Sequence, residues 1–436
     1  ILTLVTSVLI MIFADPLIRY IVSPGLDESG MILAINMTRV IAINPFLFSI
    51  ATVITSIQQA VGRFVFYSFA PAIYNIGIII GITWFTNGIN LFGVTIFEGG
   101  IMGVALGVIL GAVLQLIVSL IGLFGLGMDY EFKIYRKNQG FRSVLKLLPA
   151  RSLDQGIDYV NGIVNTNLSS RMGAGAVRSF NQASSLHQMP VNLIGVAIST
   201  AFFPKLTEEL GNGDKHEFYE TFRKALRTII WIALPVSVIA FFGRGYVTSF
   251  ISNIGNNDSN GTIASILGTL CIAIFARSVF HIASRGFYAH QDTKTPFIVS
   301  IFAIGLTIIL SVCFYLMGWG VDGLGLAQSI GAVVEIIILL FILQRRSDNE
   351  ILDKSFWRGI ARMLFATLVC GCVAFSMTKF IPLMATDNTL VITVPKFLLI
   401  AAISAVSYIA ASYFLSIKEV APIINYLKKT LFKNVK

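Results

Sequence analysis

The stretch TPFIVSIFAIGLTIILSVCFYLM, residues 295–317, carries no charged side chain and is long enough to cross a bilayer as an α-helix, which takes about 20 apolar residues. Runs of the same kind recur along the chain. Of all residues, 56% are hydrophobic and 12% are charged, and the mean hydropathy is +0.81. In soluble domains about a quarter of the residues are charged. The sequence therefore predicts an all-α polytopic membrane protein.

Hydropathy and helix-breaking residues divide the apolar runs into twelve predicted transmembrane helices. A barrel is disfavoured because its strands would alternate apolar and polar residues, whereas these runs are continuous. We place the twelve helices near residues 1–23, 36–59, 67–87, 100–125, 143–168, 176–203, 222–250, 262–284, 295–317, 323–344, 358–380 and 393–416.

Lysine and arginine are concentrated in every second connection between these helices. Connections rich in positive charge lie on the cytoplasmic side of a membrane, so both ends of this chain are expected in the cytoplasm. The net charge of +10 follows from the same distribution, and we expect it to attract anionic lipid rather than nucleic acid. The basic residues are Arg63; Lys133, Arg136, Lys137, Arg142; Lys205, Lys215, Arg223, Lys224; Arg285, Lys294; Arg345, Arg346, Lys354; Lys418, Lys428, Lys429, Lys433 and Lys436.

An internal repeat relates the two halves of the chain. GVALGVILGAVLQ, residues 103–115, aligns with GLGLAQSIGAVVE, residues 323–335, and the repeat period is six helices. An even period gives repeats of the same orientation, as in two-lobed transporters. Residues 143–203 then open the second repeat, and their counterparts would precede residue 1. We expect a chain that lacks two N-terminal helices of a fourteen-helix fold; the alternative is a natural twelve-helix protein.

Two neighbouring helices carry polar stripes, which are costly in lipid because a charge at the bilayer centre costs about 2.5–3.5 kcal/mol. Spacings of three and four residues place each set on one helix face. We predict that the stripes line a water-accessible cavity; the alternative is that they snorkel to the interface or join helices together. The stripes contain Arg151, Asp154, Asp158, Asn161 and Asn165 on the first helix, and Asn181, Ser185, Gln188 and Asn192 on the second, with Arg178 one turn earlier and His187 beside them.

Other residues of the predicted helices have simpler interpretations. Asp15 and Arg19 have the spacing of a local ion pair, and Arg277 is expected to reach an interface. The glycines at 103, 107 and 111 predict close packing between helices.

The sequence contains no pattern that indicates enzyme chemistry. It has no phosphate-binding loop, HExxH or GxSxG motif, and its four cysteines have no histidine partners at metal-binding spacing. We therefore expect neither an enzyme nor a resident metal or cofactor. A secondary carrier, a flippase, a channel or an intramembrane enzyme remains, and two parallel six-helix repeats with polar faces favour a carrier that works by alternating access.

Three motifs resemble the MurJ (MviN) family of lipid II flippases. They are MPVNLIGVAISTAFFPKL, residues 189–206; RFVFYSFAPAIYNIGIIIG, residues 63–81; and RGFYAHQDTKTP, residues 285–296. The resemblance covers essentially the whole chain. It implies the multidrug/oligosaccharidyl-lipid/polysaccharide exporter (MOP) fold, in which two pseudo-symmetric helical lobes surround a central cavity. Residues 1–126 would form the rest of the N-terminal lobe, 143–345 the C-terminal lobe, 356–417 two additional helices, and 418–436 a basic cytoplasmic tail.

The resemblance also implies the substrate. Lipid II, an undecaprenyl pyrophosphate with a disaccharide-pentapeptide, would move from the inner to the outer leaflet of the bacterial cytoplasmic membrane by alternating access. The resemblance leaves open whether Na⁺, H⁺ or the membrane potential drives the movement, and whether other cell-wall synthesis proteins bind. The alternatives are a related lipid-linked oligosaccharide flippase, a drug/cation antiporter, and a degenerate non-transporting scaffold.

This chain departs from the family pattern next to the first motif. Where relatives carry an aspartate, an arginine and a glutamate, it has Ser184, Ser185 and Gln188. We hypothesise that Arg178, two turns before Ser185, supplies the displaced positive charge, with help from His187. A sodium-ligand aspartate of some relatives aligns with Asn165, which disfavours sodium coupling. The candidates for coupling to ions are Asp154, Asp158 and Asn165, with the two aspartates as candidates for coupling to protons. The candidate substrate residues are Arg178, Asn181, Gln182, Ser184, Ser185, His187, Gln188, Asn192, Arg151, Asp154, Asp158 and Asn161.

Overall fold

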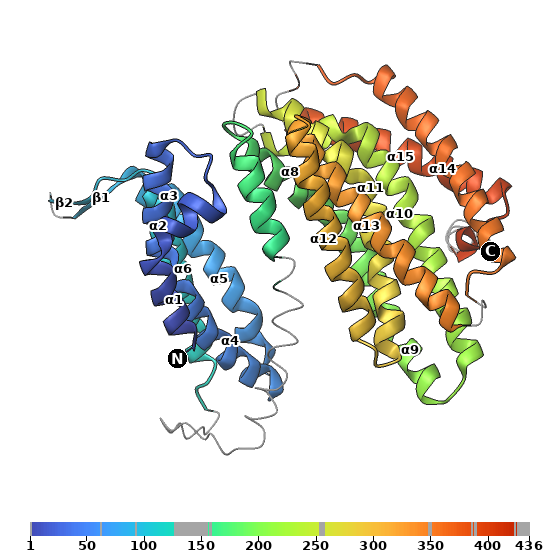
Figure 1. The fold of residues 1–436 in the computed structure, drawn as a ribbon, viewed down its shortest axis with the longest axis horizontal. Coiled ribbons are helices and arrows are strands. Elements are labelled where there is room, and N and C mark those ends of the chain that lie inside the picture. The colour runs from blue at the N-terminus through green and yellow to red at the C-terminus, as the bar shows by residue number, and fades with distance from the viewer. Residues whose placement is uncertain are drawn as a thin grey trace, which may run out of the picture. The chain divides into compact units, whose positions relative to one another are not determined.

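The computed structural model describes residues 2–61, 63–91, 94–125, 156, 159–252, 258–347, 351–384, 387, 390–422 and 424. The chain divides into two compact units, Ile1–Ala150 and Arg151–Lys436. Within the described residues both units consist of helices, with one short β-hairpin in the first (Figure 1).

The first unit contains four long helices and several short elements. The hairpin follows the helix that ends at Thr83, and it pairs Ile89 with Phe97 and Leu91 with Val94 in an antiparallel register. The elements are α1 (Leu2–Ile12), α2 (Ala14–Pro16), the π-helix η1 (Leu17–Val22), α3 (Glu28–Ile41), α4 (Asn44–Ala60), α5 (Phe64–Thr83), the 3₁₀-helix η2 (Phe85–Asn87), β1 (Ile89–Leu91), β2 (Val94–Phe97) and α6 (Met102–Ile121).

The second unit begins its described part with a helix over residues 159–170. The following elements are α8 (Ala176–Val191), the π-helix η3 (Asn192–Val196), α9 (Ala197–Gly211), α10 (Lys215–Ser252), α11 (Asp258–Ala289), α12 (Lys294–Leu316), α13 (Gly320–Arg346), α14 (Lys354–Phe380), α15 (Leu390–Phe414) and the 3₁₀-helix η4 (Lys418–Val420).

The predicted membrane-spanning helices are confirmed wherever the structure describes them. Ten helical segments are long and apolar enough to cross a membrane, and a bent pair at residues 2–22 brings the number to eleven. Each matches one predicted span to within several residues. The one remaining predicted span, residues 143–168, lies mostly outside the described residues.

The first span, predicted near residues 1–23, is bent. Its two parts meet at an angle of 72° beside Phe13. Pro16 has no N–H to donate to the carbonyl of Ile12, and its ring crowds that carbonyl, so a regular helix cannot continue here. The predicted ion pair of Asp15 with Arg19 is confirmed at 3.4 Å, and Arg19 also contacts Glu28.

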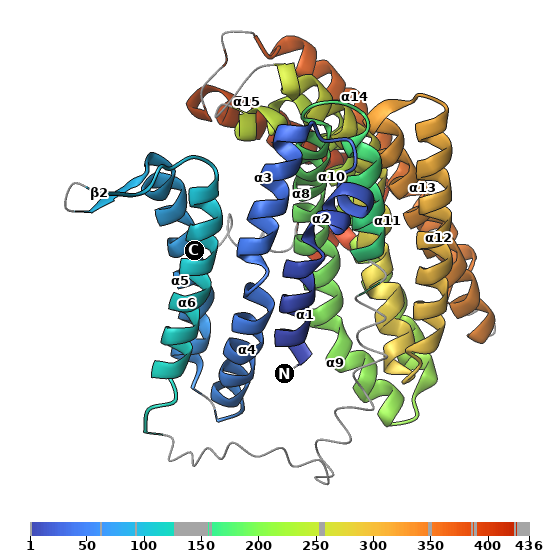
Figure 2. The same cartoon turned by 60° about the vertical axis from the view of Figure 1, so that its left-hand side comes forward.

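Glycines bring α5 and α6 into backbone contact, as the spacing of the α6 glycines predicted. The two helices lie side by side in both views of the fold (Figures 1 and 2). A Cβ atom added to Gly77 would lie 2.3 Å from the Cα of Gly111, and one added to Gly107 would lie 2.4 Å from the Cα of Gly81. Because both obstacles are backbone atoms, neither helix can accept a larger residue at the contact without moving.

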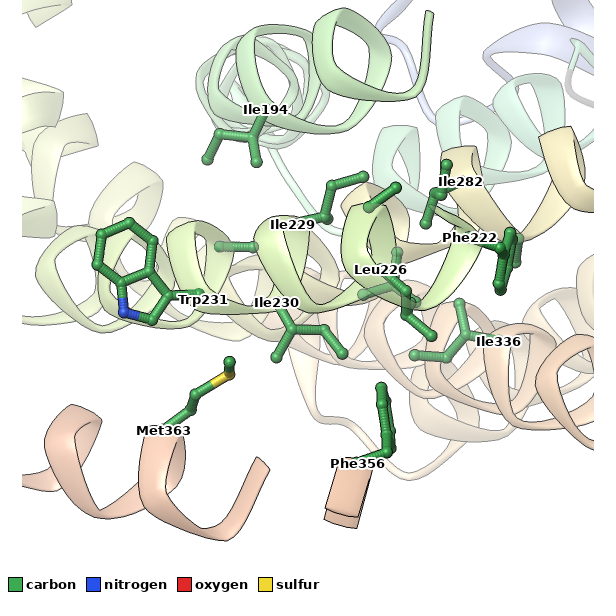
Figure 3. Close-up of a cluster of buried hydrophobic side chains, with 14 of the residues drawn as sticks. Ile194, Phe222, Leu226, Ile229, Ile230, Trp231, Ile282, Ile336, Phe356 and Met363 are labelled. Atoms are coloured by element: carbon green, nitrogen blue, oxygen red, sulfur yellow. The ribbon is translucent and has the colours of Figure 1, made fainter. Parts of the chain in front are cut away.

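In the second unit, α10 is the central helix of the largest apolar cluster. Its side chains Phe222, Leu226, Ile230 and Trp231 are buried against residues of several other helices. Figure 3 shows Phe356 and Met363 of α14 on one side of α10 and Ile194 of η3 on the other. Trp231 also joins α15, because its ring N–H donates to Ser412 at 3.1 Å while Tyr408 donates to the Trp231 carbonyl at 2.9 Å. The two C-terminal helices are therefore fixed to α10.

We predict that Gly107→Ala destabilises the first unit by about 1–3 kcal/mol, because the added methyl group overpacks the α5–α6 contact. Thermal unfolding of the purified protein measures the effect. The same change at Gly305 of α12 is the matched control, since a Cβ there meets nothing within 4 Å. If both variants unfold at the same temperature, the close contact does not contribute to stability.

Candidate functional site

The polar stripe predicted for residues 178–192 lies on one exposed face of α8 in the second unit. Arg178, Asn181, Ser185, Gln188 and Asn192 are all exposed. Gln188 donates to the side-chain oxygen of Asn192 at 3.1 Å, and the Ser185 hydroxyl donates to the Asn181 carbonyl at 2.9 Å. The face thus offers one guanidinium, three amides and one hydroxyl along four turns of helix. Such a set can bind anionic and sugar-like groups through hydrogen bonds.

The remaining candidates of α8 lie away from this face. His187 is 8% exposed, and its Nδ1 lies 2.8 Å from the Ser184 carbonyl oxygen. The hypothesis that His187 assists Arg178 on one surface therefore does not fit its position. One residue step rotates a helix by about 100°, which separates His187 from Gln188. Gln182 and Ser184 are partly buried, and the Ser184 hydroxyl has no hydrogen-bond partner among the described residues.

The stripe predicted on the preceding helix is described only in its second half. Asn165 is 2% exposed and donates to the side-chain oxygen of Asn161 at 3.1 Å, so these two residues share a face as predicted. The Asn165 side-chain oxygen has no hydrogen-bond partner among the described residues. Arg151, Asp154 and Asp158 lie outside the described residues.

A π-helical turn interrupts the span directly after the polar stripe. Pro190 cannot donate to the carbonyl of Leu186, and the chain widens into η3 two residues later. Gly195 in this turn packs against α11, where an added Cβ would lie 2.7 Å from the Cα of Ser278. The glycine of the 189–206 motif is therefore required for close packing.

The motifs at 189–206 and 285–296 pack against each other. The Arg285 guanidinium lies 4.9 Å from the centre of the Phe203 ring, in a cation–π contact that joins α11 to α9. Within the 285–296 motif, the Asp292 carboxylate accepts hydrogen bonds from the N–H and hydroxyl of Thr295. Arg346 of α13 also donates to this carboxylate, at 2.6 Å. This loop therefore connects α11, α12 and α13.

A charged cluster within the helices was not recognised from the sequence. Arg277 of α11 contacts the carboxylate of Glu335 on α13 at 3.1 Å, and Ser300 of α12 donates to the other carboxylate oxygen at 2.6 Å. Glu335 is 1% exposed and the Arg277 side chain 28%. Arg277 therefore pairs with a carboxylate 58 residues away, which its own stretch of sequence does not indicate. Among the described residues, no group of three or more His, Cys, Asp or Glu side chains could hold a metal ion.

Acid should weaken the loop at residues 290–295. Burial alone would raise the pKa of Asp292, but the Thr295 and Arg346 contacts outweigh burial and lower the pKa from 3.8 to about 2. A lowered pKa stabilises the fold above the unfolded-state pKa, and this stabilisation is lost as the pH falls from about 4 to 2. We predict that Asp292→Asn is less stable than wild type at pH 7 and that the difference shrinks below pH 4. Melting temperatures across this range test it, and a difference independent of pH would contradict it.

Removing the carboxylate of Glu335 should be strongly destabilising. Glu335→Leu leaves the Arg277 charge without its partner, which costs about 3–5 kcal/mol for buried pairs. The double variant Arg277→Met/Glu335→Leu should recover most of this loss, because it removes both charges together. Unfolding of the three proteins in the same detergent forms a double-mutant cycle. If the double variant is no more stable than Glu335→Leu, the unpaired Arg277 charge is not the cause of the destabilisation.

The chain resembles transporters of known structure and sequence along most of its length. A lipid II flippase MurJ from Burkholderia cenocepacia is 29% identical over 75% of this chain, which spans 63% of that relative's length. The structure of a lipid II flippase MurJ in an inward closed conformation superposes with a TM-score of 0.73 at 20% identity, over 95% of this chain and 81% of the other.

A second structure extends the likeness to another branch of the superfamily. An inward-facing multidrug resistance MATE family transporter of the MOP superfamily superposes with a TM-score of 0.69 at 18% identity, over 80% of this chain and 78% of that chain. These two similarities establish a MOP-type fold. The family model described as "Lipid II flippase MurJ" matches residues 1–399, so the chain belongs to the MurJ family of lipid II flippases.

Proposed function

We propose that this protein moves lipid II from the inner to the outer leaflet of the bacterial cytoplasmic membrane by alternating access. The match to the MurJ family over residues 1–399 carries the proposal. The exposed polar face of α8 is consistent with it, because a membrane-spanning helix that faced only lipid would not retain such a stripe. The protein then acts as a transporter without catalysing a covalent reaction.

The chemistry of lipid II suggests a role for each kind of group on this face. A pyrophosphate binds cations and amide donors in a site shielded from bulk water, and Arg178 presents a forked guanidinium suited to it. The amides of Asn181, Gln188 and Asn192 can pair with sugar and peptide groups, while the polyprenyl tail stays in lipid. Ser184 and Ser185 lie where relatives carry charges, which places more of the binding on Arg178.

The orientation and the energy source are further parts of the proposal. We place both ends of this chain in the cytoplasm, because the basic connections alternate with acidic ones. For coupling, a proton carried by Asp154 or Asp158 is favoured over Na⁺, because the neutral amide Asn165 stands where the family resemblance implies a sodium-ligand aspartate. A dependence of transport on membrane potential but not on pH would overturn the proton role.

A non-transporting scaffold is the competing function. The feature in its favour is the set Ser184, Ser185 and Gln188, which stand where the family resemblance implies charged residues. Depletion of the protein in its own host separates the two functions. A flippase predicts accumulation of lipid II in the inner leaflet and lysis, whereas a scaffold predicts no accumulation.

We predict that Arg178→Ala lowers lipid II flipping at least tenfold, because a hydrogen bond to a charged group contributes about 1.5–3 kcal/mol. Arg178→Lys should retain part of the activity. Arg171→Ala is the matched control, since Arg171 is also exposed but donates to Asn167 at 3.0 Å within its own helix segment. Flipping is measured by access of an external probe to lipid II in vesicles. Near-normal activity of Arg178→Ala would remove Arg178 from the substrate site.

A further inference from the structure

A basic pocket lies in the second unit where α10, α14 and the end of α15 meet, at some distance along the chain from the polar face of α8. Its cavity volume is about 90 Å³. Four of its eight lining residues are cations, and the other four are two serines, a glycine and an isoleucine. The lining residues are Arg227, Ser355, Arg358, Gly359, Arg362, Ser416, Ile417 and Lys418.

An ion pair forms a fixed part of the pocket wall. Arg227 of α10 donates to both carboxylate oxygens of Glu419 in η4, at 2.5 and 3.0 Å, and both side chains are nearly buried. Gly359 makes room for this pair, because an added Cβ would lie 2.7 Å from a guanidinium nitrogen of Arg227. The pair neutralises Arg227 and holds η4 against α10 and α14.

The other three cations of the pocket remain unneutralised. Arg358, Arg362 and Lys418 are exposed, and no carboxylate pairs with them within the part of the chain that the structure describes. Arg358 and Arg362 are four residues apart on α14, so their side chains lie on one face. Lys418 reaches the pocket from η4. It follows Ser416, whose φ of +53° is uncommon for a residue other than glycine and turns the chain back after α15.

Three free cations and two serine hydroxyls around one concavity favour an anion with several oxygen atoms. Arginine forks bind phosphate and carboxylate oxygens in pairs, and phosphate is the group that offers three or more acceptors at once. The alternative is that these cations simply face water at the cytoplasmic end of a helix, where arginine is common. That alternative does not account for the pocket or for the buried ion pair in its wall.

The surroundings of the pocket indicate that the anion belongs to a lipid. Arg358 lies one turn from the start of the membrane-spanning helix α14, where headgroups lie. Trp357, Leu364 and Phe365 beside these arginines are exposed and apolar, and tryptophan is enriched at this depth of a membrane. The opposite face of α14, with Phe356 and Met363, packs on α10 (Figure 3). An acyl chain could therefore follow the exposed face while its headgroup enters the pocket.

We propose that this pocket binds the phosphoryl headgroup of an anionic phospholipid in the leaflet that the basic connections face. Basic pockets between membrane helices on that side bind such headgroups. The site is separate from the proposed lipid II face and does not depend on lipid II being the substrate. Because the pocket joins α10, α14 and η4, an occupied site should stabilise the attachment of the C-terminal helices.

Titration of the purified full chain in neutral detergent with phosphatidylglycerol tests the proposal, with phosphatidylcholine as the lipid control. Phosphatidylglycerol should raise the melting temperature of wild type, and the midpoint of this effect should shift at least tenfold in Arg358→Gln/Arg362→Gln, given about 1.5–3 kcal/mol for each charged hydrogen bond. Arg345→Gln is the matched control. Arg345 is exposed at the end of α13 and stacks on Phe341, outside the pocket. It should respond like wild type.

Lys418→Gln supplies an independent variant from a different element, and it should also weaken the response to phosphatidylglycerol. Equal responses of wild type, the arginine double variant and Lys418→Gln would overturn the proposal in favour of general surface charge. Competition by inorganic phosphate or glycerol phosphate at the same concentration as the lipid would overturn the lipid assignment and leave a free-phosphate site. If the double variant does not fold, Lys418→Gln and Arg345→Gln alone decide the outcome.

Discussion

The cost of leaving a polar group unpartnered in lipid governs where this chain places its few polar side chains. An uncompensated charge or buried amide costs several kcal/mol in an apolar environment. Within the second unit the groups fall into two sets. Arg277, Glu335 and Ser300 satisfy one another across three helices, and Asn165 bonds to Asn161. The stripe on α8 forms the other set and remains exposed, so it requires water or a polar ligand.

The two irregular helices follow from the same constraint on backbone groups. Proline removes an N–H and leaves a carbonyl that lipid cannot satisfy. The chain bends by 72° beside Phe13, three residues before Pro16, and after Pro190 it adopts a π-helix. The second irregularity begins at Asn192, the last residue of the polar stripe, and Gly195 holds it against α11. A break in the regular α-helix thus lies next to the candidate substrate face, at a place where the proposed alternating access would need the chain to change shape.

Hydropathy was sufficient to predict the membrane-spanning helices because length and apolar composition are local properties of a segment. Spacing alone also predicted the exposed face of α8 and the contact of the α6 glycines with α5. Partners that are distant in sequence could not be predicted: nothing near Arg277 indicates Glu335, and the charge of Arg227 is matched by Glu419, 192 residues away. For His187, closeness in sequence was misleading. It is next to Gln188 in the chain, but adjacent residues point to different sides of a helix, and His187 is buried.

The attachment of α14 and α15 gives the basic pocket its importance. The contacts of Trp231 with Tyr408 and Ser412 join α15 to α10, and the Arg227–Glu419 pair joins η4 to it. Helix α14 packs on α10 within the large apolar cluster. Because interiors this closely packed transmit small displacements, a lipid headgroup that draws Arg358, Arg362 and Lys418 together would act on α10 directly. The family match reaches residue 399, within α15, so the end of α15 and η4, which complete the pocket, lie beyond it. The pocket therefore spans the end of the family match.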